Sequence, residues 1–380
     1  MIRPVHGGNL KWAASLASCA PHELIDFSAS ISPLGVPASI LQAVQAAFSL
    51  MSAYPDPGYA ELREAIARHH HLSSEYILPG NGAAELLNWA ARDLAQLPRC
   101  YCLSPGFSDY DRALGAFGGE LAPLSLFDDD LRYVDAWDSS LTGLSDLGRC
   151  GLLLNNPHNP TGALFSRERV RSLLQKFALV VIDEAFMDFL SPEREQSVID
   201  WVSECPNEFS NLVVVRSLTK FYSIPGLRLG YAIAHPDILQ RWQRWRDAWP
   251  VNVLAAAAGV AALRDTNFQQ RTWQWLKAEN AYLFQALSQL PGLTPLPSCA
   301  NFFLVRCEGS ATELQEKLLT RHRLYIRDCI SFDRLGDRFF RIAIKSREDN
   351  QKLLDALAEV LPLLTQVNAE GCTDEVNNVS

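Results

Sequence analysis

The sequence lacks a hydrophobic run long enough to span a bilayer. Its longest apolar stretch is VLAAAAGVAAL at residues 253–263, which is too short and too rich in alanine for a transmembrane helix. The first ten residues, MIRPVHGGNL, also lack the positively charged and then apolar pattern of a secretory signal peptide. We therefore expect no association with membranes and a location in the cytoplasm.

The sequence also lacks basic runs and paired cysteines. The formal net charge is −9 and no long segment rich in lysine and arginine occurs, so nucleic acid is not an expected partner. The nine cysteines are scattered and odd in number, and Cys100 and Cys102 are the only close pair. This spacing matches neither a zinc site nor a disulfide framework, so we expect no metal and a reducing environment.

What the sequence has is the composition of an ordinary globular protein. Of its 380 residues, 48% are hydrophobic and 20% are charged, so it can bury a large core. The length suits one large domain and a smaller one. We expect an N-terminal arm at 1–35, a large domain at 36–250, a small domain at 251–365 and a disordered tail at 366–380.

The order of the apolar segments indicates an α/β fold. Short apolar runs alternate with segments of helical periodicity, as in a parallel sheet whose crossover helices cover both faces. We expect one helix at 36–50, another after Pro57, and mainly helices from about 239 to 290. The expected strands are YCLSPGF, GLLLNNP, ALVVIDEAF, NLVVVRSLTK and RLGYAIA in the large domain, and segments near NFFLVR and FFRIAI in the small one.

Unusual polar residues follow three of these strands. One strand runs into Asn155 and the segment NPHNPTG, another ends at Asp183, and a third is followed by Lys220. Ligands of doubly wound sheets bind beyond the carboxyl ends of the strands, so we expect these residues to converge. Taken singly, each has an ordinary alternative: a turn for NPHNPTG, a helix cap for Asp183 and a solvated surface position for Lys220.

Together and in this order, the segments NPHNPTG, DEAF, SLTK and GLRLGY resemble the pyridoxal-phosphate enzymes of the aspartate-aminotransferase superfamily, class I/II. The resemblance covers residues 25–350 approximately. It implies a fold-type-I architecture, with a mostly parallel sheet in the large domain and a smaller α+β C-terminal domain. It also implies pyridoxal 5'-phosphate as the cofactor and a homodimer as the assembly.

The resemblance assigns two residues to the reaction itself. Lys220 would hold the cofactor as a Schiff base, and its apolar surroundings would lower the pKa of its amine. Asp183 would face the ring nitrogen and keep it protonated, which lets the ring act as an electron sink. Arg228, Ser217 and Thr219 would bind the phosphate of the cofactor.

Matching positions imply further cofactor contacts. Asn81, Gly82 and Ala83 would cradle the phosphate at a helix N-terminus, although an ordinary helix start explains such a turn equally well. Phe107 would stack on the cofactor ring, and Asn159 would donate to the phenolic oxygen of the ring.

Two aromatic positions complete the comparison with the family. Tyr54 in YPDPGY matches the tyrosine that reaches the phosphate bound in the neighbouring subunit. Phe186 in DEAF departs from the pattern, because many relatives carry tyrosine there. A tyrosine hydroxyl would share the ring-oxygen contact with Asn159, so its absence alters how the Schiff base is tuned.

The arm bears on which reaction the cofactor performs. HGGN at 6–9, followed by DFSASISPLG at 26–35, resembles the threonine-phosphate decarboxylases of cobalamin synthesis. The substrate would then be a phosphorylated amino acid. The arm donors to its phosphate would be His6, Gly7, Gly8 and Asn9, although an exposed terminus is the ordinary alternative.

The resemblance also implies roles for two arginines and two serines. Arg341 in FFRIAI would grip the substrate carboxylate, with Asn159 nearby, and Arg327 would supply the charge for the substrate phosphate. A surface ion pair is the ordinary alternative for either arginine. Relatives often show DFSANINPLG, whereas this chain has Ser30 and Ser32, so only a backbone role is retained at those positions.

The expected reaction is decarboxylation of L-threonine O-3-phosphate to (R)-1-aminopropan-2-yl phosphate. One cofactor supports transamination, decarboxylation and elimination, so the fold does not determine the reaction. Two alternatives therefore stay open. One is a histidinol-phosphate aminotransferase, and the other is a non-catalytic aminotransferase-like sensor, which the lack of a basic DNA-binding segment disfavours.

Overall fold

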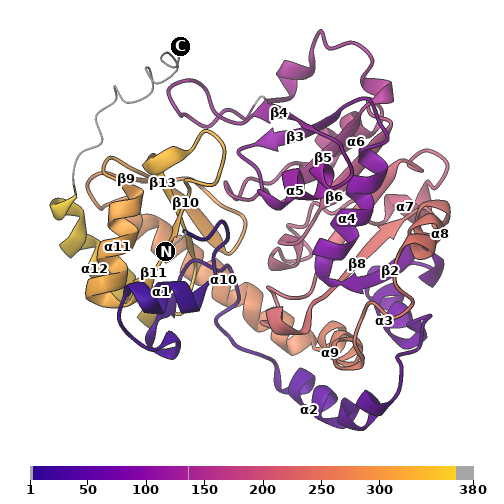
Figure 1. Ribbon diagram of the computed structural model, residues 1–380, viewed down its shortest axis with the longest axis horizontal. Coiled ribbons are helices and arrows are strands. Elements are labelled where there is room, and N and C mark those ends of the chain that lie inside the picture. Colours follow the sequence, from indigo (N-terminus) through magenta and orange to yellow (C-terminus); the bar gives the residue numbers. More distant parts are fainter. Residues whose placement is uncertain (1–2, 136, 365–380) are drawn as a thin grey trace, which may run out of the picture.

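The computed structural model describes residues 3–135 and 137–364. Figure 1 shows two lobes, a larger one around a seven-stranded sheet and a smaller one around a four-stranded sheet. The larger sheet has the order β2-β8-β7-β6-β5-β3-β4, in which β8 runs antiparallel to both β2 and β7 and the other neighbouring pairs are parallel. The expected α/β fold with a mostly parallel sheet is thus confirmed. The strands are β2 (Ile77–Asn81), β3 (Cys100–Ser104), β4 (Leu121–Ser125), β5 (Gly151–Asn155), β6 (Leu179–Asp183), β7 (Leu212–Ser217) and β8 (Leu229–Ala234).

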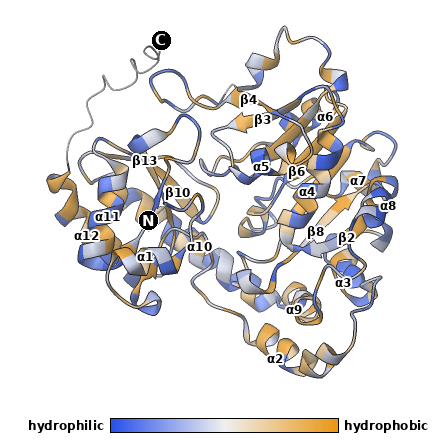
Figure 2. Cartoon of the chain, in the orientation of Figure 1, coloured by the Kyte–Doolittle hydropathy of each residue, from blue (hydrophilic) through white to orange (hydrophobic). Residues whose placement is uncertain are grey.

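The central strands are apolar throughout because both faces of the sheet are covered. Every residue of β5, β6, β7 and β8 is buried. Successive side chains enter two separate cores: Val180 and Ile182 of β6 pack into one, and Val181 packs into the other. Figure 2 shows β6 and β8 in the apolar colour, surrounded by helices that also carry polar residues.

Helices supply the outer layer on each face. One core receives side chains from α4 (Gly82–Leu94), α5 (Asp109–Gly115) and α8 (Pro236–Trp245). The other receives side chains from α2 (Ala38–Ala46), α3 (Ala60–His70), α6 (Arg167–Leu174), α7 (Trp201–Glu204) and α9 (Val253–Arg264). Helix α9 packs against α2 and α3, so it lies with the larger lobe.

The five expected strands of the larger lobe are confirmed, but β2 and β4 were not predicted. Strand β2 contains Pro79 and Gly80, and Pro123 lies in the middle of β4. Both residue types are unfavourable in strands, because proline donates no ladder hydrogen bond and glycine packs poorly. The two strands lie at the edges of the sheet, where a missing donor is tolerated.

The smaller lobe is α+β, as expected. Its sheet has the antiparallel order β12-β13-β10-β9, and the strands predicted near NFFLVR and FFRIAI are confirmed. These strands are β9 (Leu293–Pro295), β10 (Phe302–Cys307), β12 (Arg327–Asp328) and β13 (Phe339–Ala343), and the helices are α10 (Thr266–Leu287), α11 (Ala311–His322) and α12 (Arg347–Val360). The register sets Arg327 directly opposite Arg341.

The arm lies on the smaller lobe and is partly helical. Asn9 accepts a hydrogen bond from the Trp12 amide and so caps α1 (Leu10–Leu16), which contacts α11. Strand β1 (Ile25–Asp26) pairs in parallel with β11 (Leu324–Tyr325). The predicted tail at 366–380 lies outside the described residues. Over 3–135 and 137–364, no helix combines the length and apolarity that crossing a membrane requires.

Candidate active site

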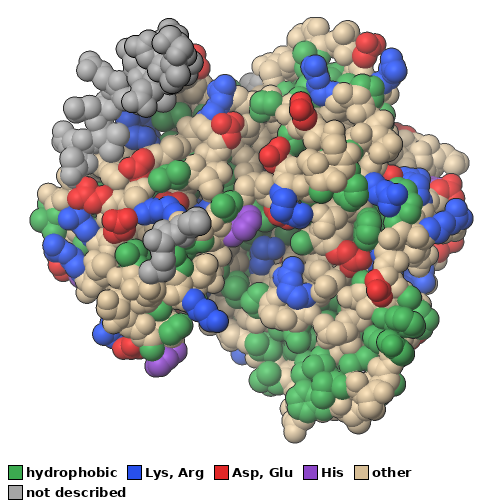
Figure 3. Space-filling view, in the orientation of Figure 1, with side chains coloured by type: hydrophobic (Ala, Val, Ile, Leu, Met, Phe, Trp, Pro, Cys, Tyr) green, Lys and Arg blue, Asp and Glu red, His purple; other side chains and the backbone are tan. Residues whose placement is uncertain are grey.

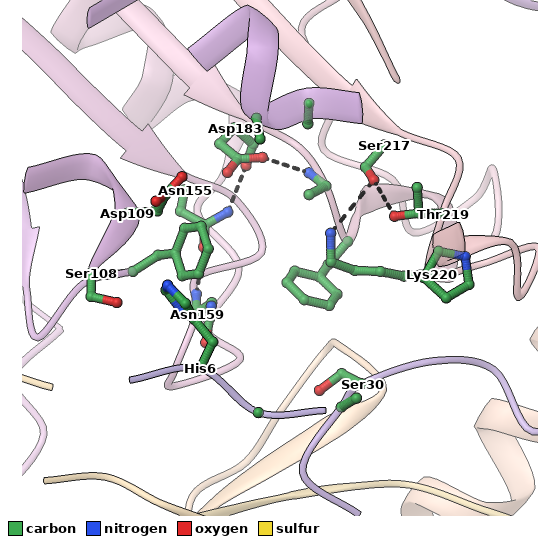
Figure 4. Close-up of a pocket in the computed structure, with 18 of the residues that line it drawn as sticks. His6, Ser30, Ser108, Asp109, Asn155, Asn159, Asp183, Ser217, Thr219 and Lys220 are labelled. Atoms are coloured by element: carbon green, nitrogen blue, oxygen red, sulfur yellow. Dashed lines mark hydrogen bonds between the residues drawn. The ribbon is translucent and has the colours of Figure 1, made fainter. Parts of the chain in front are cut away.

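A cavity of about 310 Å³ lies where the strand ends of the larger lobe face the arm and the smaller lobe. Figure 4 shows polar side chains at the strand ends of the larger lobe, among them Asp183 and Lys220, with His6 and Ser30 of the arm on the opposite side. The polar strand ends that were predicted to converge therefore meet in one place. The lining includes Asn155, Asn159, Asp183, Ser217 and Lys220 from the larger lobe, His6 and Ser30 from the arm, and Arg327 and Arg341 from the smaller lobe.

Lys220 follows β7 and lines this cavity. Its Nζ lies 3.5 Å from Ser217 Oγ and 5.1 Å from the centroid of the Phe186 ring. Burial lowers the pKa of the amine. The Asp183 carboxylate opposes this shift, whereas the Arg228 charge adds to it. The amine therefore loses its proton more readily than an exposed lysine does, as a nucleophile requires.

Asp183 ends β6 with its carboxylate held from two sides. Its Oδ2 accepts a hydrogen bond from the Tyr110 hydroxyl at 2.6 Å, and its Oδ1 accepts one from the Ala185 amide at 3.0 Å. Asn155 donates to the backbone carbonyl of Asp183 at 2.7 Å, which ties together two strand ends. Burial raises the pKa of this carboxyl, and the hydrogen bond from Tyr110 and the charge of Lys220 lower it.

Arg228 lies against the N-terminus of α4. At Gly82, the first residue of α4, φ is +74° and an added Cβ would stand 2.5 Å from Arg228 Nη2. The backbone conformation thus favours glycine, and any Cβ here would also require the Arg228 guanidinium to shift. Ala83 lines the cavity, whereas Asn81 is exposed at the N-cap and does not line it. The guanidinium and the helix N-terminus together form a cradle for an anion.

Ser217 and Thr219 add two hydroxyl groups to the cavity wall. Their Oγ and Oγ1 atoms are 2.7 Å apart, and both residues line the cavity together with Arg228. Each hydroxyl can donate one hydrogen bond and accept others. These groups can therefore bind oxygens of the same anion as the cradle at α4.

The apolar part of the wall comes from aromatic rings. Phe107 lines the cavity and packs perpendicular to the Tyr110 ring, with the centroids 5.4 Å apart and the planes at 88°. Phe186 packs edge-on against Phe302 at 5.0 Å. Phe186, which carries no hydroxyl, lines the cavity together with Asn159.

The two buried arginines of the smaller lobe face each other across β12 and β13. Like charges at directly opposite positions repel, and the buried Asp328, whose Oδ1 lies 3.7 Å from Arg327 Nη1, offsets part of this repulsion. Arg341 donates to Asn159 Oδ1 and to the Ser28 carbonyl, and its Nε has no partner among the described residues. Burial lowers the pKa of Arg341 to about 10.

Arg327 holds the arm over the cavity. Its guanidinium donates to the carbonyls of Pro4 and Val5 and to the Ser331 hydroxyl. The side chain is 4% exposed and lines the cavity. The arginine thus links the small lobe and the arm at the edge of the cavity.

Only part of the predicted arm motif reaches the cavity. His6 and Gly7 line it, but Gly8 and Asn9 do not. Gly8 donates its amide to Ser28 Oγ at 2.8 Å, and Asn9 caps α1. An added Cβ at Gly7 would stand 2.3 Å from the Ser28 carbonyl oxygen, so glycine permits the arm to lie this close.

The two serines of DFSASISPLG have different surroundings. Ser30 lines the cavity, and its buried Oγ has no hydrogen-bond partner among the described residues. Ser32 is engaged through its backbone: its amide donates to the Lys220 carbonyl at 3.0 Å, and its carbonyl accepts from Ser223 Oγ at 2.7 Å. The expected backbone role is therefore present at Ser32.

Sequence reasoning missed the Ser30 hydroxyl and Tyr110 as site groups. Tyr110 follows Phe107 by three residues, a spacing that places both on one side of a helical turn and could have indicated it. No sequence signal indicates that Ser30 lacks a partner. Tyr54 lies outside the cavity of its own chain, 78% exposed and stacked on Trp249 at 4.3 Å. Its contact with a neighbouring subunit stays a prediction.

Comparisons with known proteins agree with this architecture. The chain is 40% identical to a threonine-phosphate decarboxylase from Salmonella typhimurium, over 95% of this chain and 98% of that protein. It is 36% identical to a putative threonine-phosphate decarboxylase from Caldanaerobacter subterraneus, over 86% and 88%. The structure of a histidinol-phosphate aminotransferase from Clostridium acetobutylicum superposes with a TM-score of 0.80 at 29% identity, covering 90% of this chain and all of that one. The sequence model described as aminotransferase class I and II matches residues 22–357, so the chain belongs to that family.

Proposed function

We propose that the chain binds pyridoxal 5'-phosphate and decarboxylates L-threonine O-3-phosphate to (R)-1-aminopropan-2-yl phosphate for cobalamin synthesis. Its similarity to threonine-phosphate decarboxylases over most of its length supports the proposal. The observation that carries the proposal is the pair Arg327 and Arg341, buried on facing strand positions in the cavity that Lys220 lines. Arg327 already has Asp328 as an ion-pair partner, and a substrate with one carboxylate and one phosphate would add an anion for each of the two guanidinium groups.

The cavity has the groups that the proposed cofactor requires. Gly82 leaves room for Arg228 at the start of α4, and Ser217 and Thr219 add donors for a phosphate. The buried Asp183 offers an acceptor to a ring nitrogen, and Phe107 offers an apolar face. When bound, the cofactor supplies an aldehyde that reacts with amines and a ring that withdraws electrons from the substrate's Cα.

In this proposal the chain's own residues orient the substrate at both ends. Arg341 binds the carboxylate, and Arg327 with His6 binds the phosphate. Asn159, which already bonds Arg341, keeps that guanidinium in place. Gly7 allows the arm to approach closely, while Gly8 and Asn9 act indirectly by holding it. Fixing both ends decides which bond at Cα is broken, and the arm limits the entry of water.

Lys220 has the second catalytic task in this proposal. After carbon dioxide leaves, its Nζ delivers a proton to Cα, so that a hydrogen replaces the lost carboxylate. The lowered pKa of the amine suits this exchange, because a group whose pKa is nearer to the working pH both takes up and releases protons readily.

We further propose that the protein acts as a homodimer in which Tyr54 reaches the phosphate of the neighbouring subunit. Figure 3 shows apolar side chains gathered on the surface over α2. The apolar patch consists of Leu41, Phe48, Leu50, Met51, Tyr54 and Trp249, all of them exposed in the single chain. Exposed apolar side chains in such number are typical of protein interfaces.

A decarboxylation assay tests the proposed reaction. The purified protein loaded with pyridoxal phosphate should release carbon dioxide from L-threonine O-3-phosphate, and Lys220→Ala should not. The structural likeness to a histidinol-phosphate aminotransferase makes amino transfer from histidinol phosphate to 2-oxoglutarate the second assay. Amino transfer without carbon dioxide release would refute the decarboxylase, and inactivity in both assays would favour a sensor.

A further inference from the structure

Tyr110 is a buried polar residue of the cavity to which the proposed function gives no role. It lies on α5 and is 2% exposed, and its hydroxyl donates to Asp183 Oδ2 at 2.6 Å. The two residues lie 73 positions apart in the chain, so this bond forms only in the folded protein. Its partner is the carboxylate that would face the cofactor ring.

Tyr110 also contacts the aromatic ring on the cavity wall. The two rings are perpendicular, and the centroid of Tyr110 lies 5.4 Å from that of Phe107. Perpendicular aromatic pairs of this kind are favourable and orient both rings. One side chain therefore touches both the acceptor for a ring nitrogen and the ring that would stack on the cofactor.

The hydroxyl of Tyr110 stabilises the charged form of Asp183. Burial alone favours the neutral carboxyl and raises its pKa, and the hydrogen bond from Tyr110 is the largest influence that lowers it. The pKa of Tyr110 itself is raised well above its usual value by burial and by the Asp183 charge. The hydroxyl thus keeps its proton and acts toward Asp183 as a donor.

The second oxygen of Asp183 is fixed as well. Oδ1 accepts from the Ala185 amide at 3.0 Å, so the carboxylate has a donor on each oxygen and cannot rotate without losing both bonds. A carboxylate has about four acceptor positions, so each oxygen can still accept one more hydrogen bond. The carboxylate is therefore oriented in advance, yet retains the capacity to bind a ligand N–H.

We propose that Tyr110 is a positioning residue, which acts through Asp183 to keep a proton on the ring nitrogen of the bound cofactor. The inference rests on the proposed cofactor. With the hydroxyl present, Asp183 is the weaker base and the shared proton stays on the ring nitrogen. Without it, Asp183 becomes the stronger base and the proton moves toward the carboxylate.

The test compares Tyr110→Phe with Tyr101→Phe as the matched control. Both changes remove one hydroxyl from a buried tyrosine and keep the ring, but Tyr101 packs on Phe177 away from the cavity. The first readout is the dissociation constant for pyridoxal phosphate, measured by equilibrium dialysis. Losing a hydrogen bond to a charged group should weaken binding about tenfold in Tyr110→Phe, and Tyr101→Phe should match the native protein.

The second readout is the ¹⁵N resonance of pyridoxal phosphate labelled at its ring nitrogen. In Tyr110→Phe the resonance should move toward the unprotonated position, and in Tyr101→Phe it should stay. Equal resonances and equal affinities in the two variants would overturn the inference. A native protein that does not bind the labelled compound would refute the proposed cofactor instead, so the two failures differ.

A double variant shows whether Tyr110 acts through Asp183. In the Asp183→Asn background, Tyr110→Phe should cause little further loss of cofactor affinity, because the acceptor is already changed. An additional loss as large as that of the single variant would mean that the tyrosine acts by packing alone, which overturns the inference.

Discussion

The chemistry of Lys220 follows from its immediate surroundings. The amine lies above the apolar Phe186 ring, and burial outweighs the attraction of Asp183 in setting the direction of its pKa shift. Because the pKa of Lys220 is lower than that of a free lysine, a larger fraction of its amine is neutral at the same pH. Such an amine is nucleophilic under conditions in which a surface lysine is protonated.

In the apoprotein, the Lys220 amine should consequently react with pyridoxal phosphate at a lower pH than the amine of an exposed lysine does. The rate should rise with pH and then level off, and the midpoint of the rise should lie below the pKa of about 10.4 of a free lysine. Stopped-flow absorbance over a pH series measures this midpoint. Asp183→Asn removes an influence that raises the pKa, so its midpoint should lie lower still. A native midpoint at or above the free-lysine value would contradict the role of burial.

Ser30 is a second residue whose surroundings suggest a role. Its unpartnered buried hydroxyl faces the cavity, and a buried donor without a partner costs free energy. Ser30→Ala should remove a contact to the phosphorylated substrate and raise KM about tenfold, the value of one hydrogen bond to a charged group. Ser32→Ala is the matched control, because Ser32 acts through its backbone. Equal KM values in the two variants would show that the Ser30 hydroxyl does not contact substrate.

At the scale of elements, burial on both faces made the central strands predictable. Strands β5, β6 and β7 are runs of large apolar residues that end in polar ones, so both their positions and the convergence of their ends could be inferred. Edge strands β2 and β4 could not be predicted, because each contains residues that are unfavourable in strands. Each is also stabilised by pairing with only one neighbouring strand. Local sequence carries little information about pairing at an edge.

The same limit separates the site residues that could be predicted from those that could not. Asp183 and Lys220 each follow an apolar run, and so local pattern indicates them. The bond between Tyr110 and Asp183 depends on how α5 packs beside β6, which no local pattern encodes. The facing positions of Arg327 and Arg341 likewise depend on the register of β12 and β13.

The start of α4 gives a prediction at this scale. Gly82→Ala places a Cβ 2.5 Å from Arg228 Nη2 at a φ of +74°, so the guanidinium must move and the backbone is strained. The free energy of unfolding should fall by about 1–3 kcal/mol, and affinity for pyridoxal phosphate should fall with it. Urea unfolding and equilibrium dialysis measure these two quantities.

Gly115→Ala is the control for that change. Gly115 is the last residue of α5, and an added Cβ there meets nothing within 4 Å. Alanine in a helix is favoured over glycine by about 0.5–1 kcal/mol, so this variant should be at least as stable as the native protein. If Gly82→Ala behaved like Gly115→Ala, the close approach of Arg228 would have no energetic consequence.

At the scale of the whole molecule, the cavity exists only because three parts of the chain meet. The larger lobe supplies Lys220 and Asp183, the smaller lobe supplies the two arginines, and the arm covers them through Arg327. The arm itself is fixed by β1 pairing with β11 and by α1 packing on α11. Tyr54, the tyrosine expected to bind phosphate, lies outside this cavity and stacks on Trp249 instead.

A dimer built on the apolar patch would supply that tyrosine from the neighbouring subunit. Sedimentation velocity should show the native protein as a dimer, and Leu41→Lys with Met51→Lys should convert it to a monomer, because buried charges without partners are costly. Leu363→Lys, an equally drastic change at an exposed leucine of the other lobe, should leave the dimer intact.

The monomeric variant should also bind pyridoxal phosphate more weakly, and Tyr54→Phe should reproduce that loss while remaining dimeric. A patch variant that stays dimeric would place the interface elsewhere, and undiminished cofactor affinity in a monomer would show that each chain completes its own phosphate site.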